Sequence, residues 1–213
     1  MRKLSLMLLL SFLAINVNAQ QAKNHWYIGL DAFKGIPSYV LPNKFVLKNT
    51  FIIEPLVRMD VQDSRKSVVF GAGYAKGTTK VISEQIPFQN FRGFYIKASY
   101  EVKNLNRPMH IGIGPIISLS DFNGNYRFKG PVFGDYEGSV HEKRIAFGAE
   151  GNFSYDVRVS KKIALRLLLR GSVATHPSSN MYIQYFPGIG YNKGIDNILV
   201  SGGFATQLYY RIN

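Results

Sequence analysis

A histidine and a serine two residues apart, His176 and Ser178, precede the last strand-like segment of the chain. Side chains two residues apart on an extended backbone point the same way, so His176 could act as the base that activates the Ser178 hydroxyl. Asp196 is the candidate for the group that orients the imidazole. Pro177 interrupts the pair, and a chance occurrence of His and Ser in one loop is the simpler explanation. We therefore expect no enzyme, with a hydrolase as the alternative.

Charged side chains of both signs occupy alternate positions of the strand-like segments, opposite the apolar residues. If the segments enclose one interior, these charges must pair there, because an unpaired charge away from water is costly. Arg166 and Arg170 would pair with Glu54, Glu150 or Asp156. The expected interior charge network consists of Glu54, Arg58, Asp60, Lys97, Glu101, Glu150, Asp156, Arg158, Arg166 and Arg170.

Metal and nucleotide sites are not expected. The remaining histidines, His25, His110 and His141, lack the spacing of metal ligands. The motifs Gly71-Ala72-Gly73 and Gly112-Ile113-Gly114 fit glycines within strands and do not fit phosphate-binding loops. The sequence therefore predicts no metal ion and no cofactor.

The first residues predict export. Arg2 and Lys3 precede a short apolar run, and Val17-Asn18-Ala19 offers a cleavage site, so residues 1–19 are expected to be a signal peptide and 20–213 a single β-barrel domain. The apolar run is too short to span a hydrocarbon core of about 30 Å. The formal charge of +13 becomes 13 − 2 = +11 without Arg2 and Lys3. For an exported chain without cysteine, anionic lipid and surface polysaccharide are the expected anionic partners in place of nucleic acid, and the alternative is that the basic loops only keep the protein soluble.

Eight segments alternate apolar and polar residues with period two, as strands with one apolar face do. Two of them, 51–61 and 163–173, also fit an amphipathic helix. Pro55 excludes the helix in the first, because proline inside a helix costs about 3 kcal/mol, and a strand irregularity is expected there. The other segments favour a strand for the second. The expected strands cover about residues 26–33, 51–61, 68–75, 94–102, 110–120, 144–159, 163–173 and 198–212.

Connections between these segments alternate long and short. The long ones are about 34–50, 81–89, 121–143 and 175–197. The connection 121–143 is expected to be a loop with room for a projecting hairpin. This alternation predicts an eight-stranded antiparallel up-and-down transmembrane β-barrel with four long loops at one rim and three short turns at the other. The alternative is a soluble lipocalin-like ligand-binding barrel. A polar stripe with both charge signs favours the membrane barrel, whose interior side chains would fill.

The chain from about Trp26 to Asn213 resembles the small eight-stranded outer-membrane β-barrel proteins of Gram-negative bacteria, with an OmpA/OmpX-like architecture. The resemblance rests on the alternation, the asymmetric connections and the last strand, which ends Leu208-Tyr209-Tyr210-Arg211-Ile212-Asn213. The segment 185–191 also looks like part of an uncharacterised subfamily. Separately, residues 176–180 are similar to the His-x-Ser-Asn pattern of outer-membrane lipid A deacylases, which makes a deacylase-like hydrolase the enzymatic alternative.

These likenesses imply a place in the cell outer membrane, where the surrounding lipid is the first partner, and a monomer. The expected role is non-enzymatic, either structural in the envelope or in surface interaction. Aromatic residues in the long loops would bind a surface glycan or protein, or would pack together as a lid; they are Tyr126, Phe128, Phe133, Tyr136, Tyr182, Tyr185 and Phe186.

Overall fold

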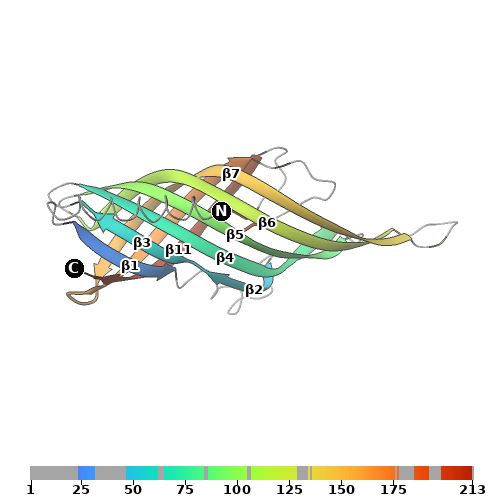
Figure 1. The fold of residues 1–213 in the computed structure, drawn as a ribbon, viewed down its shortest axis with the longest axis horizontal. Coiled ribbons are helices and arrows are strands. Elements are labelled where there is room, and N and C mark those ends of the chain that lie inside the picture. Colours follow the sequence, from blue (N-terminus) through green and yellow to red (C-terminus); the bar gives the residue numbers. More distant parts are fainter. Residues whose placement is uncertain are drawn as a thin grey trace, which may run out of the picture.

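The computed structural model is built of β-strands (Figure 1). It describes residues 24–31, 47–61, 65–83, 86–104, 107–128, 134, 136–175, 177, 185–191 and 198–212. No helix in this part of the chain is long and apolar enough to cross a membrane. The strands are β1 (His25–Asp31), β2 (Leu47–Ile53), β3 (Pro55–Asp60), β4 (Lys66–Ser83), β5 (Ile86–Lys103), β6 (Met109–Phe128), β7 (Tyr136–Arg158), β8 (Ile163–Thr175), β9 (Tyr185–Phe186), β10 (Gly190–Tyr191) and β11 (Ile198–Arg211).

One antiparallel sheet closes on itself to form the barrel. Its neighbours follow the order β1, β3, β4, β5, β6, β7, β8 and β11, and β11 pairs back with β1. β2 continues the line of β3 along β4, so the two share one of the eight places in the ring. Each of the eight places in the ring therefore has a neighbour on both sides, so the strands pair all the way around the barrel. The predicted eight-stranded up-and-down barrel is confirmed.

The strand that contains Pro55 is interrupted where the sequence predicts an irregularity. The strand breaks at Glu54, between β2 and β3, although the pairing with β4 keeps one register across the break. The shift of register in this strand lies further along, between Lys48 and Phe51. The expected irregularity is thus confirmed as a break without an inserted residue.

Side chains point alternately out of the barrel and into it. In β8, Leu167 and Leu169 are exposed whereas Arg166 and Leu168 are buried, so residues 163–173 form a strand and the predicted faces are confirmed. Large apolar residues form a belt around the outside, a distribution opposite to that of a soluble barrel. Belt residues between 49% and 65% exposed include Phe94, Ile96, Ile111, Ile113, Phe147, Leu169, Val173 and Phe204.

The two rims of the barrel differ. At one end β3 and β4, β5 and β6, and β7 and β8 are joined by the three short connections that the sequence predicts, and we call this end the short-turn rim. At the other end, the hairpin rim, β4 and β5 continue to Ser83 and Ile86, so the expected connection 81–89 is largely strand. β6 and β7 likewise pair as far as Phe128 and Tyr136 and project beyond the barrel (Figure 1). The backbone hydrogen bonds between these strands continue beyond the residues that alternate between apolar and polar, because strands outside the belt need no apolar face.

Candidate functional site

The inward side chains of β5 pass through three layers of the barrel interior. Phe91 and Tyr95, nearest the hairpin rim, belong to a buried apolar cluster. Lys97 and Glu101 follow and make ion pairs. Lys103 lines a cavity at the short-turn rim. The interior therefore consists of an apolar plug, a charged middle and a cavity.

A short segment before β11 plugs the hairpin rim from within. Its strands β9 and β10 pair with each other, and residues 185–189 are buried. The ring centroid of Tyr185 lies 4.7 Å from that of Phe91, and the centroid of Phe186 lies 5.4 Å from that of Phe122. These are favourable separations for aromatic pairs. Of the two roles expected for loop aromatics, a partner surface or a lid, Tyr185 and Phe186 serve as a lid.

Polar contacts attach this lid to the barrel wall. The Ser172 hydroxyl donates to the Ile189 carbonyl at 2.9 Å, and the Arg170 guanidinium donates to the Gly188 carbonyl at 3.4 Å. Gly188 has a φ of +77°, and a Cβ there would overlap the Tyr95 ring. Glycine meets both requirements, since it adopts positive φ freely and has no side chain.

The upper part of the charged middle is a chain of four ionic groups. Lys97 Nζ lies 2.8 Å from Glu54 Oε1 and 3.0 Å from Glu150 Oε1. Glu150 Oε2 accepts a hydrogen bond from Arg170 at 3.3 Å. The Tyr95 hydroxyl donates to the second oxygen of Glu54. Two cations balance two carboxylates, so these four groups are neutral together.

The lower part of the charged middle centres on Arg166, which is fully buried. Its guanidinium lies 2.9 Å from Glu101 Oε2 and 2.7 Å from Asp156 Oδ1. Arg58 lies 2.7 Å from the other oxygen of Asp156 and 2.5 Å from Asp60 Oδ1. Each arginine thus joins two carboxylates, an arrangement suited to its planar fork of donors.

Two side chains outside the predicted network also belong to this lower part. His110 is buried, with Nε2 at 3.1 Å from Asp156 Oδ2. The Tyr209 ring centroid lies 5.4 Å from Arg166 Cζ and 5.9 Å from Arg58 Cζ, within cation–π range. Strand alternation places both residues on the polar face, and this signal would have identified them.

Nine of the ten residues of the expected network make these ion pairs, and Arg158 is exposed at the short-turn rim. Two of the expected pairs occur, Arg166 with Asp156 and Arg170 with Glu150. Glu54 instead forms an ion pair with Lys97, which lies two strands away in the sheet. Glycines on the intervening β4 leave the space that this crossing requires.

Gly73 of β4 provides a test of that crossing. A Cβ at Gly73 would overlap the Tyr95 ring, whereas one at the outward Gly202 meets its first atom at 3.8 Å. We expect Gly73→Ala to displace Tyr95 from Glu54 and to lower the free energy of unfolding by about 1–3 kcal/mol. Urea unfolding of both alanine variants in lipid vesicles measures this difference. Equal midpoints for the two variants would show that Tyr95 is not held against Gly73.

A polar cluster joins strands just beyond the belt at the hairpin rim. Asp121 Oδ2 accepts from the Arg92 guanidinium at 2.9 Å, and Asp121 Oδ1 lies 2.6 Å from His141 Nε2. Partial burial acts to raise the pKa of Asp121, but these hydrogen bonds outweigh it and hold the pKa below its ordinary value. The ionised form therefore ties β5, β6 and β7 together where the hairpin begins.

The depressed pKa of Asp121 gives this contact a pH dependence. A lowered folded-state pKa means that the stabilisation is complete above the ordinary value of about 3.9 and is lost as the pH falls below it. We expect a nitroxide attached to the cysteine of a Tyr136→Cys variant to become more mobile as the pH falls from 5 to 2.5, as measured by electron paramagnetic resonance. Asp121→Asn should remove most of this change and Glu142→Gln should not. The reverse pattern would assign the effect to Glu142.

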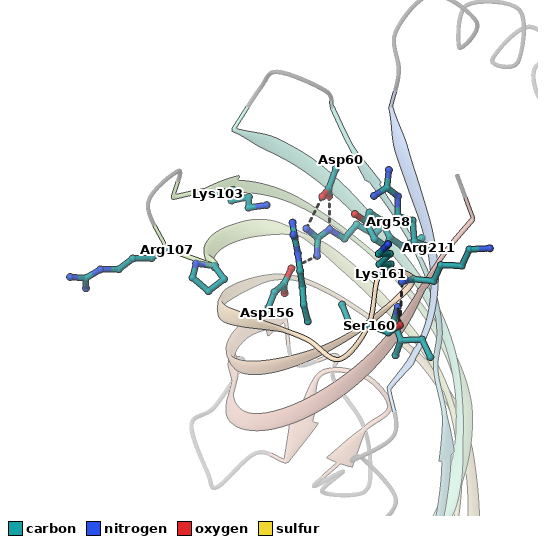
Figure 2. A pocket seen from close by; sticks show the side chains of 14 residues that line it. Arg58, Asp60, Lys103, Arg107, Asp156, Ser160, Lys161 and Arg211 are labelled. Carbon is teal, nitrogen blue, oxygen red and sulfur yellow. Dashed lines mark hydrogen bonds and ion pairs between the residues drawn. The ribbon is translucent and has the colours of Figure 1, made fainter.

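The cavity at the short-turn rim has a volume of about 670 Å³ and a basic lining (Figure 2). Its two carboxylates, Asp60 and Asp156, both pair with Arg58. The lining therefore has a formal charge of 7 − 2 = +5. Its cationic side chains are Arg58, Lys103, Arg107, Arg158, Lys161, Lys162 and Arg211.

Other predicted features are not placed by the structure. The candidate hydrolytic residues His176, Ser178 and Asp196 lie outside the described residues, as does the expected signal peptide. Within the described part of the chain, no three His, Asp or Glu side chains are grouped so that they could hold a metal ion.

A closed barrel with an apolar belt outside and paired charges inside defines the class of membrane-spanning β-barrels. The chain is similar to Ail, the attachment invasion locus protein of Yersinia pestis, solved in complex with the heparin analogue sucrose octasulfate, at a TM-score of 0.38 and 9% identity, over 91% of this chain and 100% of that chain. It is also similar to neisserial surface protein A (NspA), at a TM-score of 0.36 and 12% identity, over 88% of this chain and 95% of that chain. No family model and no curated protein matches the chain. The class therefore rests on the strand pairing and polarity of the barrel itself.

Proposed function

We propose that this protein is a non-enzymatic barrel of the cell outer membrane, with a structural or surface-interaction role in the envelope. The observation that carries the proposal is the inverted polarity of a closed sheet. Phe94 and Leu169 are exposed on the outside at 62% and 59%, whereas Arg166 is fully buried inside. Lipid chains can contact such a belt without loss of hydration, and the closed sheet gives the backbone N–H and C=O groups their hydrogen-bond partners.

The interior charge network holds the wall together in this proposal. Its ion pairs connect β3, β5, β7 and β8 across the lumen, and the lid formed by residues 185–191 covers the network at the hairpin rim. An eight-stranded barrel is just wide enough for side chains to fill it. A filled and plugged lumen supports a role in which the barrel does not conduct and functions as a scaffold.

Surface interaction falls to the projecting β6–β7 hairpin. Bacterial membrane barrels have short turns on the periplasmic side and longer segments outside the cell, so the hairpin rim faces outward. Tyr136, the first residue of β7, is 65% exposed, and amphipathic aromatic side chains of this kind bind sugar rings and protein surfaces. We propose a surface glycan or a protein as the partner, and a monomeric barrel in the surrounding lipid.

Membrane fractionation combined with heat-dependent gel mobility tests the proposal. We expect the protein in the outer-membrane fraction, with a faster band before heating than after it. A variant in which residues 123–141 are replaced by a two-residue turn should keep this behaviour, because β6 and β7 remain paired within the belt, and should lose retention on a panel of sulfated and neutral glycans. A soluble protein, or a mobility that heating does not change, would refute the barrel. Equal glycan retention by both proteins would refute only the role of the hairpin.

A further inference from the structure

We propose that the cavity at the short-turn rim binds phosphate groups. This site lies at the opposite end of the barrel from the hairpin and has a different chemistry. Deeper in the barrel, cations lie beside carboxylates, as in the group formed by Glu54, Lys97, Glu150 and Arg170. In the cavity, cations outnumber carboxylates and the lining has a formal charge of 7 − 2 = +5.

The excess cations lack acidic neighbours. Among the described residues, no acidic side chain lies within ion-pair distance of five of them, which are Lys103, Arg107, Arg158, Lys161 and Lys162. Like charges gathered around one hollow repel each other, which disfavours the folded state unless an anion lies among them. The cavity is therefore complementary to a ligand of high negative charge density.

The turns that carry these cations are ordered by their own hydrogen bonds. In the β7–β8 turn, the Ser160 hydroxyl accepts from the backbone N–H groups of Lys162 at 3.2 Å and Ile163 at 3.0 Å. At the end of β5, the backbone N–H of Lys103 donates to the Arg65 carbonyl of the neighbouring turn at 2.6 Å. Held turns preorganise a binding site, because little conformational freedom is left to lose on binding.

Several elements of the rim bring their cations to the same hollow. Figure 2 shows Lys103 on one side of the hollow and Lys161 and Arg211 on the other, with Arg58 and Asp60 between them, whereas the Arg107 side chain extends away from it. A phosphate group presents several charged oxygens in different directions, so cations from several sides suit it better than they suit a single carboxylate.

The phosphate group that binds in the cavity could belong to either of two kinds of molecule. The cavity borders the belt, since its lining includes Ile163, which is 38% exposed at the start of β8. A phospholipid headgroup of the adjoining leaflet therefore lies within reach, and basic clusters at a membrane face attract anionic lipid. A soluble phosphate ester is the other source.

The test uses the full chain with two matched double variants. Lys103→Gln with Arg158→Gln removes two cavity cations that have no acidic partner, and Lys76→Gln with Lys143→Gln removes two exposed cations toward the hairpin rim. Heat-dependent gel mobility first establishes that both variants are closed. One arm titrates the protein in an uncharged detergent with inorganic pyrophosphate by calorimetry. The other measures, by native mass spectrometry, phosphatidylglycerol retained from phosphatidylcholine nanodiscs that contain a small fraction of it.

We expect saturable binding in at least one arm, weakened by about tenfold or more in the cavity variant and unchanged in the control. Binding of pyrophosphate alone assigns a soluble phosphate ester, and retention of phosphatidylglycerol, with or without pyrophosphate binding, assigns a headgroup. Absence of binding in both arms overturns the proposal. An equal loss in both variants also overturns it, because it would show attraction by net charge and no site in the cavity.

Discussion

Replacing Arg166 by leucine is expected to lower the free energy of unfolding by about 3–5 kcal/mol. The guanidinium is fully buried between Glu101 and Asp156, and its removal leaves the Glu101 carboxylate without its cation in a place that water does not reach. The chain has one tryptophan, Trp26, so urea unfolding in lipid vesicles can be followed by its fluorescence without further labels.

Two further variants identify the origin of that loss. Arg158→Leu removes the same charge at an exposed position and should change the free energy of unfolding little. Arg166→Leu combined with Glu101→Leu should recover part of the loss, because Asp156 keeps Arg58 and no buried carboxylate is left unpaired. If Arg166→Leu and Arg158→Leu proved equally mild, the charge network would not stabilise the barrel.

Replacing Leu169 by lysine is expected to destabilise the barrel in a bilayer by about 2–4 kcal/mol. Leu169 is 59% exposed within the belt of β8, where lipid chains surround it in the proposed membrane barrel. In a soluble protein an equally exposed leucine could become lysine at almost no cost, since the ammonium would be hydrated. The size of the effect therefore reports on what surrounds the belt.

Tyr136→Lys is the matched control for Leu169→Lys. Tyr136 has a similar exposure of 65%, but it lies at the far end of the projecting hairpin. Lysine at this position should change the free energy of unfolding by less than about 0.5 kcal/mol. Both variants are compared by urea unfolding in vesicles, and a mild effect at both positions would mean that water and not lipid surrounds the belt.

Period-two alternation was sufficient to predict the barrel, because the pleat of a strand separates two faces and a closed sheet gives each face one environment. The same rule placed Arg166, Arg170 and Glu150 in the interior. It also decided the ambiguous segment 163–173, whose spacing alone fits a helix as well as a strand.

Features that depend on contacts across the barrel were not predictable from the sequence. The pairing of Glu54 with Lys97 depends on space left by glycines on β4, and the lid at residues 185–191 is a loop by composition that becomes buried through Phe91 and Phe122. The sequence pattern predicts strands β4 to β7 that are shorter than those in the structure, because the parts of these strands beyond the belt are polar and carry no apolar signal. The basic cavity is assembled from separate turns and β11, and no single stretch of sequence indicates it.

Site-specific lipid quenching tests the inverted polarity of the barrel most directly. The chain contains no cysteine, so a single cysteine at Leu169 or at Tyr136 can carry a fluorophore without a background to remove. In vesicles of brominated phospholipid, the label at residue 169 should be strongly quenched by the acyl chains and shielded from aqueous iodide. The label at residue 136 should show the opposite pattern. Iodide quenching at residue 169 without quenching by brominated lipid would contradict a membrane-spanning barrel.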